Sequence, residues 1–249
     1  MRSTFYKYAI GCCTGLLVGI SSYGQGSYPD TAARQAQLDN IVANYYGTIG
    51  DQSRLYNGPE YNFYPKSIKG SAYFADALDF NTGGVQYDGF EYKNLQVMYD
   101  LNKDAIVMQM PNKEASIELI SERLQGFDLL GHHFIRIEPA VLANAQNLTA
   151  GFYDQMYKGK TEFIIRREKA IQNNTSGVLD RFFTDESRKM YLFINGAYKS
   201  FNNQNSLYDV LGDKKEELKK YVKDNHISFR DEKEQAMVKV IAYYDQITN

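Results

Sequence analysis

Apolar and polar side chains alternate over residues 85–92, a pattern typical of β-strands with one buried face. Asp88-Gly89 lies at the centre of this segment, and the dipeptide readily takes the positive φ angles of a two-residue type I′ turn. The resulting register places Val85 opposite Tyr92 on one face of a hairpin. Beyond Tyr92 the apolar positions shift by one residue, so we expect a β-bulge near Lys93-Asn94.

The period of two continues along the chain in short segments separated by turns. Asn195-Gly196 predicts a second hairpin and Lys158-Gly159 a third. The other predicted strands cover residues 105–110, 117–120, 126–130, 134–137, 152–157, 161–167, 190–194 and 197–201. Residues 51–70 fit neither period and predict an irregular, aromatic-rich connection. We expect a loop or weak helical turn over residues 139–150 and a flexible polar excursion over residues 172–177.

Helical periodicity marks both ends of the chain. The first helix is predicted to start at Asp30, its N-cap, and to stop at Gly47, and further helices are predicted over about residues 206–248. Asp231 and Glu234 have the spacing of a capping box for the last helix. The predicted buried face of that helix consists of Met237, Val240, Ile241, Tyr244 and Ile247.

Together these elements predict an α+β fold that is predominantly β. The 21 Tyr and 14 Phe residues favour pleated, half-buried surfaces and support the same conclusion. We expect a single antiparallel meander sheet or partial barrel, with an N-terminal helix and C-terminal helices packed on it. No segment of linker composition separates the helices from the strands, so residues 25–249 are predicted to form one domain.

The first part of the chain, residues 1–24, has the features of a secretory signal peptide. It starts with basic residues, continues with an apolar stretch that is short for a membrane-spanning helix, and ends in Ser22-Tyr23-Gly24, which places small residues at the two positions that signal peptidase reads. We expect cleavage after Gly24 and export to the periplasm, the outer membrane or the extracellular space. A lipoprotein modified at Cys12 stays open as an alternative.

Removal of this leader changes the composition of the chain. Both cysteines, Cys12 and Cys13, lie within it, so the mature chain is predicted to contain no disulfide and no cysteine metal site. Loss of Arg2 and Lys7 leaves 26 basic residues against 30 acidic ones, a net charge of −4. The mature chain is thus slightly acidic and has no run of Lys and Arg residues, which binding to nucleic-acid phosphates requires. We therefore expect no nucleic-acid partner. No later segment reaches the roughly 18 consecutive apolar residues that indicate a transmembrane helix.

The chain also carries a set of turn and helix motifs. They are Gly84-Val85-Gln86-Tyr87-Asp88-Gly89, Tyr92-Lys93-Asn94-Leu95 with Tyr99-Asp100, Tyr157-Lys158-Gly159-Lys160-Thr161, Glu217-Leu218-Lys219-Lys220-Tyr221-Val222 and Ala242-Tyr243-Tyr244-Asp245. In these motifs the chain resembles a group of uncharacterised secreted and envelope proteins of Bacteroidota. The resemblance covers most of the mature chain and implies a location in the envelope of a Gram-negative cell. The group has no assigned activity, so the resemblance implies no catalytic residue.

Few residues have a spacing that suggests a cofactor or a metal. His132 and His133 would point to opposite faces of a strand, and His226 is the remaining histidine, so we predict no metal site and no cofactor. Residues 100–104 copy the start of a calcium loop, but Ala105 stands where the loop needs glycine, and a hairpin turn explains the same residues. The mature chain has no nucleophile elbow and no phosphate-binding glycine loop.

The most conspicuous candidates for recognition are the aromatic residues of the irregular segment, namely Tyr56, Tyr61, Phe63 and Tyr64. Such rings suit sugar stacking or a protein interface, although they would equally serve to anchor the segment on the sheet. We therefore expect a non-enzymatic binding or scaffold module for a partner protein, an envelope glycan or a lipid-like ligand. The alternative is a periplasmic or extracellular hydrolase that uses paired carboxylates or a His–carboxylate site.

Overall fold

The structure is a computed structural model that describes residues 33–38, 40, 41, 44, 54–138, 148–174, 180–230 and 232–248. The chain divides into two compact units, Met1–Asn40 and Ile41–Asn249. In the first unit, residues 33–38 and 40 are helical, which confirms the predicted N-terminal helix.

Some predicted features lie outside the described residues. They are the signal peptide with its cleavage after Gly24, the helix ends at Asp30 and Gly47, and most of the loop over residues 139–150. The structure therefore leaves these features as predictions.

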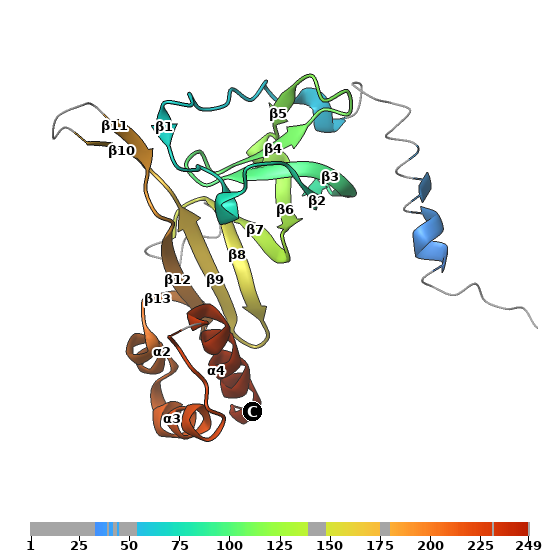
Figure 1. Ribbon diagram of the computed structural model, residues 1–249. Coiled ribbons are helices and arrows are strands. Elements are labelled where there is room, and N and C mark those ends of the chain that lie inside the picture. The colour runs from blue at the N-terminus through green and yellow to red at the C-terminus, as the bar shows by residue number, and fades with distance from the viewer. Residues whose placement is uncertain are drawn as a thin grey trace, which may run out of the picture. The chain divides into compact units, whose positions relative to one another are not determined.

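The second unit is built on one large sheet with the strand order β13-β12-β9-β8-β7-β6-β2-β3-β4-β5, in which every neighbouring pair is antiparallel. The strands are β2 (Asn81–Tyr87), β3 (Phe90–Asp100), β4 (Ala105–Gln109), β5 (Ser116–Glu118), β6 (Leu124–Leu129), β7 (His132–Ile137), β8 (Gly151–Lys158), β9 (Glu162–Glu168), β12 (Ser187–Ile194) and β13 (Ala197–Phe201). The predicted β-rich fold is confirmed. The sheet does not close on itself, because β5 and β13 are separate edges (Figure 1).

The hairpins follow the turn chemistry of the sequence. Asp88 and Gly89 have φ angles of 53° and 79°, and Val85 pairs with Tyr92 as predicted. The register shifts opposite Lys93-Asn94, which confirms the expected bulge. The turn between β12 and β13 has the same pair of positive φ angles, so the hairpin predicted at Asn195-Gly196 is confirmed too.

A second, smaller sheet was not predicted. It has the order β1-β11-β10 and contains β1 (Ile68–Lys69), β10 (Ile171–Asn174) and β11 (Asp180–Phe183). The pairing of β1 with β11 is parallel. The expectation of a flexible excursion over residues 172–177 is therefore wrong for the residues in β10, because these pair with β11. After β9 the chain leaves the large sheet, and β10 and β11 form an arm (Figure 1).

Among the apolar clusters of the described residues, two large ones stabilise the large sheet. The first contains the stacked rings of Phe127 and Phe134, whose centroids are 4.5 Å apart, together with Tyr99 and Phe152. It also includes side chains of the short 3-10 helices η2 (Arg54–Asn57) and η3 (Phe74–Asp76). A third 3-10 helix, η4 (Ser121–Arg123), leads into β6.

The second core lies between the sheet and the C-terminal helices α2 (Gln204–Leu211), α3 (Lys215–Asp224) and α4 (Lys233–Ile247), with η6 (Gly212–Lys214) between α2 and α3. Met237, Val240 and Ile241 of α4 are fully buried in it, which confirms the predicted core face. The predicted capping box is wrong, because Glu232 is the N-cap residue and makes no side-chain cap. Within the described part of the chain, no helix is long and apolar enough to cross a membrane.

Candidate functional site

An open pocket of about 530 Å³ lies where three segments of the second unit meet. The turn between β3 and β4 forms one part of its lining, the end of β9 forms another, and the connection from β11 to β12 forms the third. Its lining consists of Leu101, Asn102, Lys103, Asp104, Arg166, Glu168, Lys169, Ala170, Thr184, Asp185 and Ser187. Three of these side chains are cationic and three are anionic, and the volume is within the range of small-molecule sites.

The floor of this pocket depends on Arg166, whose side chain is only 9% exposed. Its Nη1 donates to Asp104 Oδ2 at 2.8 Å and to the carbonyl oxygen of Phe152 at 2.9 Å. Asp104 also accepts a 2.6 Å hydrogen bond from the Tyr99 hydroxyl. Burial raises the pKa of the Asp104 carboxyl, and the positive charge of Arg166 opposes this shift. The arginine therefore stays fixed between β8, β9 and the β3–β4 turn.

Glu168 is held in a different electrostatic environment. It accepts from Lys189 Nζ at 2.8 Å and from Arg166 Nε at 3.3 Å. Burial alone would raise the pKa of this carboxyl, but Lys189 and Arg166 outweigh burial and lower it. Two carboxylates on the same pocket thus have pKa values that are shifted in opposite directions.

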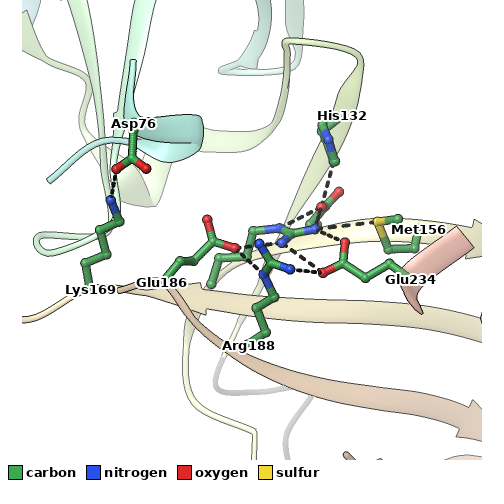
Figure 2. Close-up of polar contacts among 9 residues, drawn as sticks. Asp76, His132, Met156, Lys169, Glu186, Arg188 and Glu234 are labelled. Carbon is green, nitrogen blue, oxygen red and sulfur yellow. Dashed lines mark hydrogen bonds and ion pairs between the residues drawn. The ribbon is translucent and has the colours of Figure 1, made fainter. Parts of the chain in front are cut away.

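Lys169 is the third cation of the lining, and it is also occupied. Its ammonium group donates to the carbonyl oxygen of Ser71 at 2.8 Å and pairs with Asp76 of η3. Figure 2 shows this pair apart from the other labelled charges. Lys169 therefore ties the end of β9 to the segment before β2.

The groups that remain available in the pocket are Lys103, Asp185 and Ser187. The side chains of Asp185 and Ser187 are exposed and make no hydrogen bond or ion pair with the described residues, while the backbone of Ser187 pairs with Glu168 in the β12–β9 ladder. Lys103 has no carboxylate partner in the described part of the chain, and its Nζ lies 4.1 Å from the centre of the Tyr61 ring. Arg166 Nη2 likewise has no hydrogen-bond partner among the residues that the structure describes.

A buried ion cluster centred on Arg167 lies on the opposite face of β9, because neighbouring residues of a strand point to opposite sides. The Arg167 side chain is 3% exposed and donates to Asp154 Oδ2 from both Nε, at 2.8 Å, and Nη2, at 2.6 Å. It also pairs with Glu186 and with Glu234 of α4. Figure 2 shows Glu186, Glu234 and Arg188 converging on this cluster. The cluster connects the sheet to the last helix.

The two neighbouring histidines each contact a carboxylate. His132 Nδ1 lies 2.8 Å from Asp154 Oδ2, and His133 Nδ1 lies 2.7 Å from Asp128 Oδ1. The side chain of His132 is 31% exposed, and its ring packs edge-on against Phe74. Neither histidine belongs to the lining of the pocket described above. No group of three or more potential metal ligands occurs among the described residues.

The four predicted recognition residues do not form one exposed surface. Tyr61 is buried, and its hydroxyl donates to Asp100 Oδ2 at 2.7 Å. The Tyr64 hydroxyl donates to the same carboxylate oxygen at 2.9 Å, and the Tyr64 ring packs against Phe183. Burial, followed by the hydrogen bonds to Tyr73 and Asp100, raises the pKa of Tyr61.

The other two rings differ from these. Tyr56 is partly buried against the first core, and Phe63 is 52% exposed while its ring contacts Tyr61 edge-on. The segment thus anchors the chain at Asp100, and Phe63 is the member of the set that presents most of its ring to solvent.

Residues 100–104 form the hairpin turn that the sequence predicted. Asp100 Oδ1 accepts hydrogen bonds from the backbone N–H groups of Asn102 and Lys103, at 2.9 and 3.0 Å. Asn102 Nδ2 donates to the Tyr64 hydroxyl at 2.8 Å. The turn therefore holds Asn102 and Lys103 at the rim of the pocket, while the aromatic segment supports it from behind.

Sequence reasoning missed the arginines of β9. Arg166 and Arg167 follow directly on the apolar run Phe163-Ile164-Ile165, and two adjacent arginines extending a buried strand were the available signal. Comparison with models of protein families, with curated proteins and with solved structures finds no match for the chain.

Proposed function

We propose that this protein is an exported binding module of the cell envelope and that the pocket beside Arg166 is its ligand site. The observation that carries this proposal is the division of the lining into occupied and available groups. Arg166, Glu168 and Lys169 are fixed by ion pairs, whereas Lys103 and Asp185 have no ionic partner in the described part of the chain. A fixed lining with a few available polar groups is typical of a preformed binding site.

The pocket chemistry favours binding over catalysis. Carboxylates with shifted pKa values in one cleft are typical of active sites, and Asp104 and Glu168 meet that condition. However, a catalytic acid or base must reach the substrate, and geometry takes precedence over pKa. Both oxygens of each carboxylate already accept hydrogen bonds from the protein, those of Asp104 from Tyr99 and Arg166 and those of Glu168 from Arg166 and Lys189. The Asp104 and Glu168 carboxylates therefore hold the Arg166 side chain in place.

The lining also favours a polar ligand over a lipid-like one. Leu101 and Ala170 are its two apolar members, and the other lining residues carry charged, hydroxyl or amide side chains. Burial of unpaired polar groups against a lipid tail would cost free energy. Among the three ligand classes expected from the sequence, the two polar ones, a glycan and a segment of polypeptide, fit this pocket better than a lipid-like ligand.

A second candidate function is supported by His132. Its Nδ1 contacts the buried carboxylate of Asp154, Arg167 fixes that carboxylate, and Nε2 has no partner among the described residues. This is the arrangement of a histidine general base oriented by an aspartate. A hydrolase would use the partly exposed His132 ring, which packs edge-on against Phe74, to accept a proton. Loss of hydrolysis in H132A, with the fold retained, would support this alternative.

A competition between two tryptophan variants tests the binding proposal. A170W fills the pocket, and L78W places the same side chain at a site that is 88% exposed and outside the lining. The probe is the deproteinised, dialysable fraction of a cell-envelope digest, analysed by mass spectrometry after gel filtration with each protein. We expect the wild type and L78W to retain a small molecule that A170W does not retain. Equal retention by all three proteins, or retention by none, would contradict the proposal.

Export is a separate part of the proposal and rests on the predicted leader. N-terminal sequencing of the protein from an envelope fraction should give a chain that begins at Gln25. A chain that begins at Met1 or at a modified Cys12 would refute cleavage after Gly24.

A further inference from the structure

We propose that the ligand of the pocket is a short zwitterionic peptide, whose carboxylate binds Lys103 and Arg166 and whose amino group binds Asp185. This inference rests on the proposed binding function and specifies its substrate class. Its basis is a pair of opposite charges on two different segments of the lining, neither of which has an ionic partner among the described residues. Lys103 comes from the β3–β4 turn, and Asp185 comes from the connection between β11 and β12.

The positive side of the pocket can hold a carboxylate in a fixed position. Lys103 is oriented by the rings of Tyr61 and Tyr64, at 4.1 and 5.1 Å from their centres, and by the carbonyl oxygen of Asn62 at 3.4 Å. Arg166 contributes Nη2, the guanidinium nitrogen without a hydrogen-bond partner in the described chain, on a side chain that is nine-tenths buried. A charged donor that is already immobilised loses little entropy when it binds.

The negative side has a different composition. Asp185 and Ser187 flank Glu186, whose carboxylate is committed to Arg167 and Arg188. Because Glu186 is fixed in this way, the backbone on either side of it is also held in place. The Asp185 carboxylate and the Ser187 hydroxyl can then receive an ammonium group and a neighbouring amide.

The size of the pocket argues for more than one amino acid. A volume of about 530 Å³ is well above that of a single small amino acid and suits two or three residues. Asn102 and Thr184 also belong to the lining; Asn102 donates to the Tyr64 hydroxyl and Thr184 accepts from the Ala170 N–H, which leaves the Asn102 carbonyl oxygen and the Thr184 O–H to match peptide N–H and C=O groups. A neutral sugar would leave Lys103 and Asp185 without charged partners.

Isothermal titration calorimetry with tri-alanine and its capped forms tests the inference. The probes are tri-alanine, N-acetyl-tri-alanine, tri-alanine amide and the neutral disaccharide maltose. Both charged residues are exposed, so K103M and D185N are expected to fold, and their melting temperatures serve as the control. We expect tri-alanine to bind and each cap to weaken binding by about tenfold or more, the effect of losing one ionic contact of roughly 1.4 kcal/mol.

The variants then assign each end of the peptide. D185N should lower the affinity for tri-alanine but leave the already lower affinity for N-acetyl-tri-alanine unchanged. K103M should lower the affinity for tri-alanine but leave the already lower affinity for tri-alanine amide unchanged. Equal affinity of free and capped peptides would overturn the inference. If the protein binds maltose but not tri-alanine, and A170W abolishes maltose binding, the peptide inference is overturned. The same result would support the proposed binding function of the pocket. Failure of every probe, together with no small molecule retained from the envelope digest, would refute the proposed function as well.

Discussion

Replacement of Arg167 by methionine should destabilise the second unit strongly. Arg167 and Asp154 have side chains that are 3% and 1% exposed, so the variant leaves a buried carboxylate whose remaining side-chain partner, within the part of the chain that the structure describes, is His132. Removing one member of a buried ion pair typically costs about 3–5 kcal/mol. For a domain of this size that corresponds to a fall in melting temperature of roughly 6–20 °C.

Arg188 provides the matched control for this experiment. It contacts the same Glu186 and Glu234, but its side chain is 53% exposed, so R188M should cost at most about 1 kcal/mol. Urea unfolding followed by far-UV circular dichroism gives both values, since the chain has no Trp for fluorescence. D154N in the R167M background should recover part of the loss, because it removes the buried charge.

A different outcome would refute this reasoning. If R167M and R188M cost the same small amount, Asp154 must be solvated or neutral in the folded protein. If R167M is severe but D154N gives no recovery, the loss comes from Glu186, Glu234 or the packing of the arginine stem, and not from an unpaired Asp154.

Three further predictions address other parts of the second unit. I241A removes a fully buried side chain of α4 and should cost about 2–5 kcal/mol in urea unfolding; an unchanged midpoint would mean that α4 does not dock. Y87F removes a buried hydroxyl that lies beside the Ile120 backbone and the Arg123 guanidinium without a well-formed hydrogen bond to either, so its stability should lie within about 1 kcal/mol of the wild type; a larger loss would show that this hydroxyl is hydrogen-bonded. Burial raises the pKa of Glu168, but Lys189 and Arg166 outweigh burial and lower it. The ionised carboxylate therefore stabilises the folded protein at pH values above its ordinary pKa of 4.5, and this stabilisation is lost as the pH falls through the lowered pKa. Wild-type stability should therefore decline more than that of E168Q between pH 5 and pH 2 in thermal melts, and parallel declines would contradict the assignment.

Local interactions explain why much of the fold could be predicted. The hairpins at Asp88-Gly89 and Asn195-Gly196 depend on positive φ angles that neighbouring residues determine, and both occur in the structure. The buried face of α4 follows from a helical repeat, in which residues three and four apart share one side. Even the bulge at Lys93-Asn94 was visible as a change of parity within a single strand.

The candidate site could not be predicted in the same way, because its residues come from separate segments. The predicted aromatic set shows the difference: the Tyr61 and Tyr64 hydroxyls both donate to Asp100, a residue of β3. No local pattern relates positions 61 and 64 to position 100. The aromatic spacing marks these rings as candidates, but the carboxylate that binds two of their hydroxyls is supplied by the tertiary structure.

The sequence by itself determined the strands, their turns and the helical ends, since these depend on the conformational preferences and side-chain periods of neighbouring residues. The tertiary structure decided how the strands are ordered, and in particular that the segment after β9 leaves the large sheet as an arm beside β1. It also decided the roles of Arg166 and Arg167, which are adjacent in sequence and face opposite sides of β9. One supports the pocket through Asp104 and the other joins the sheet to α4 through Glu234, because a buried charge is tolerated only where the fold brings it counter-charges.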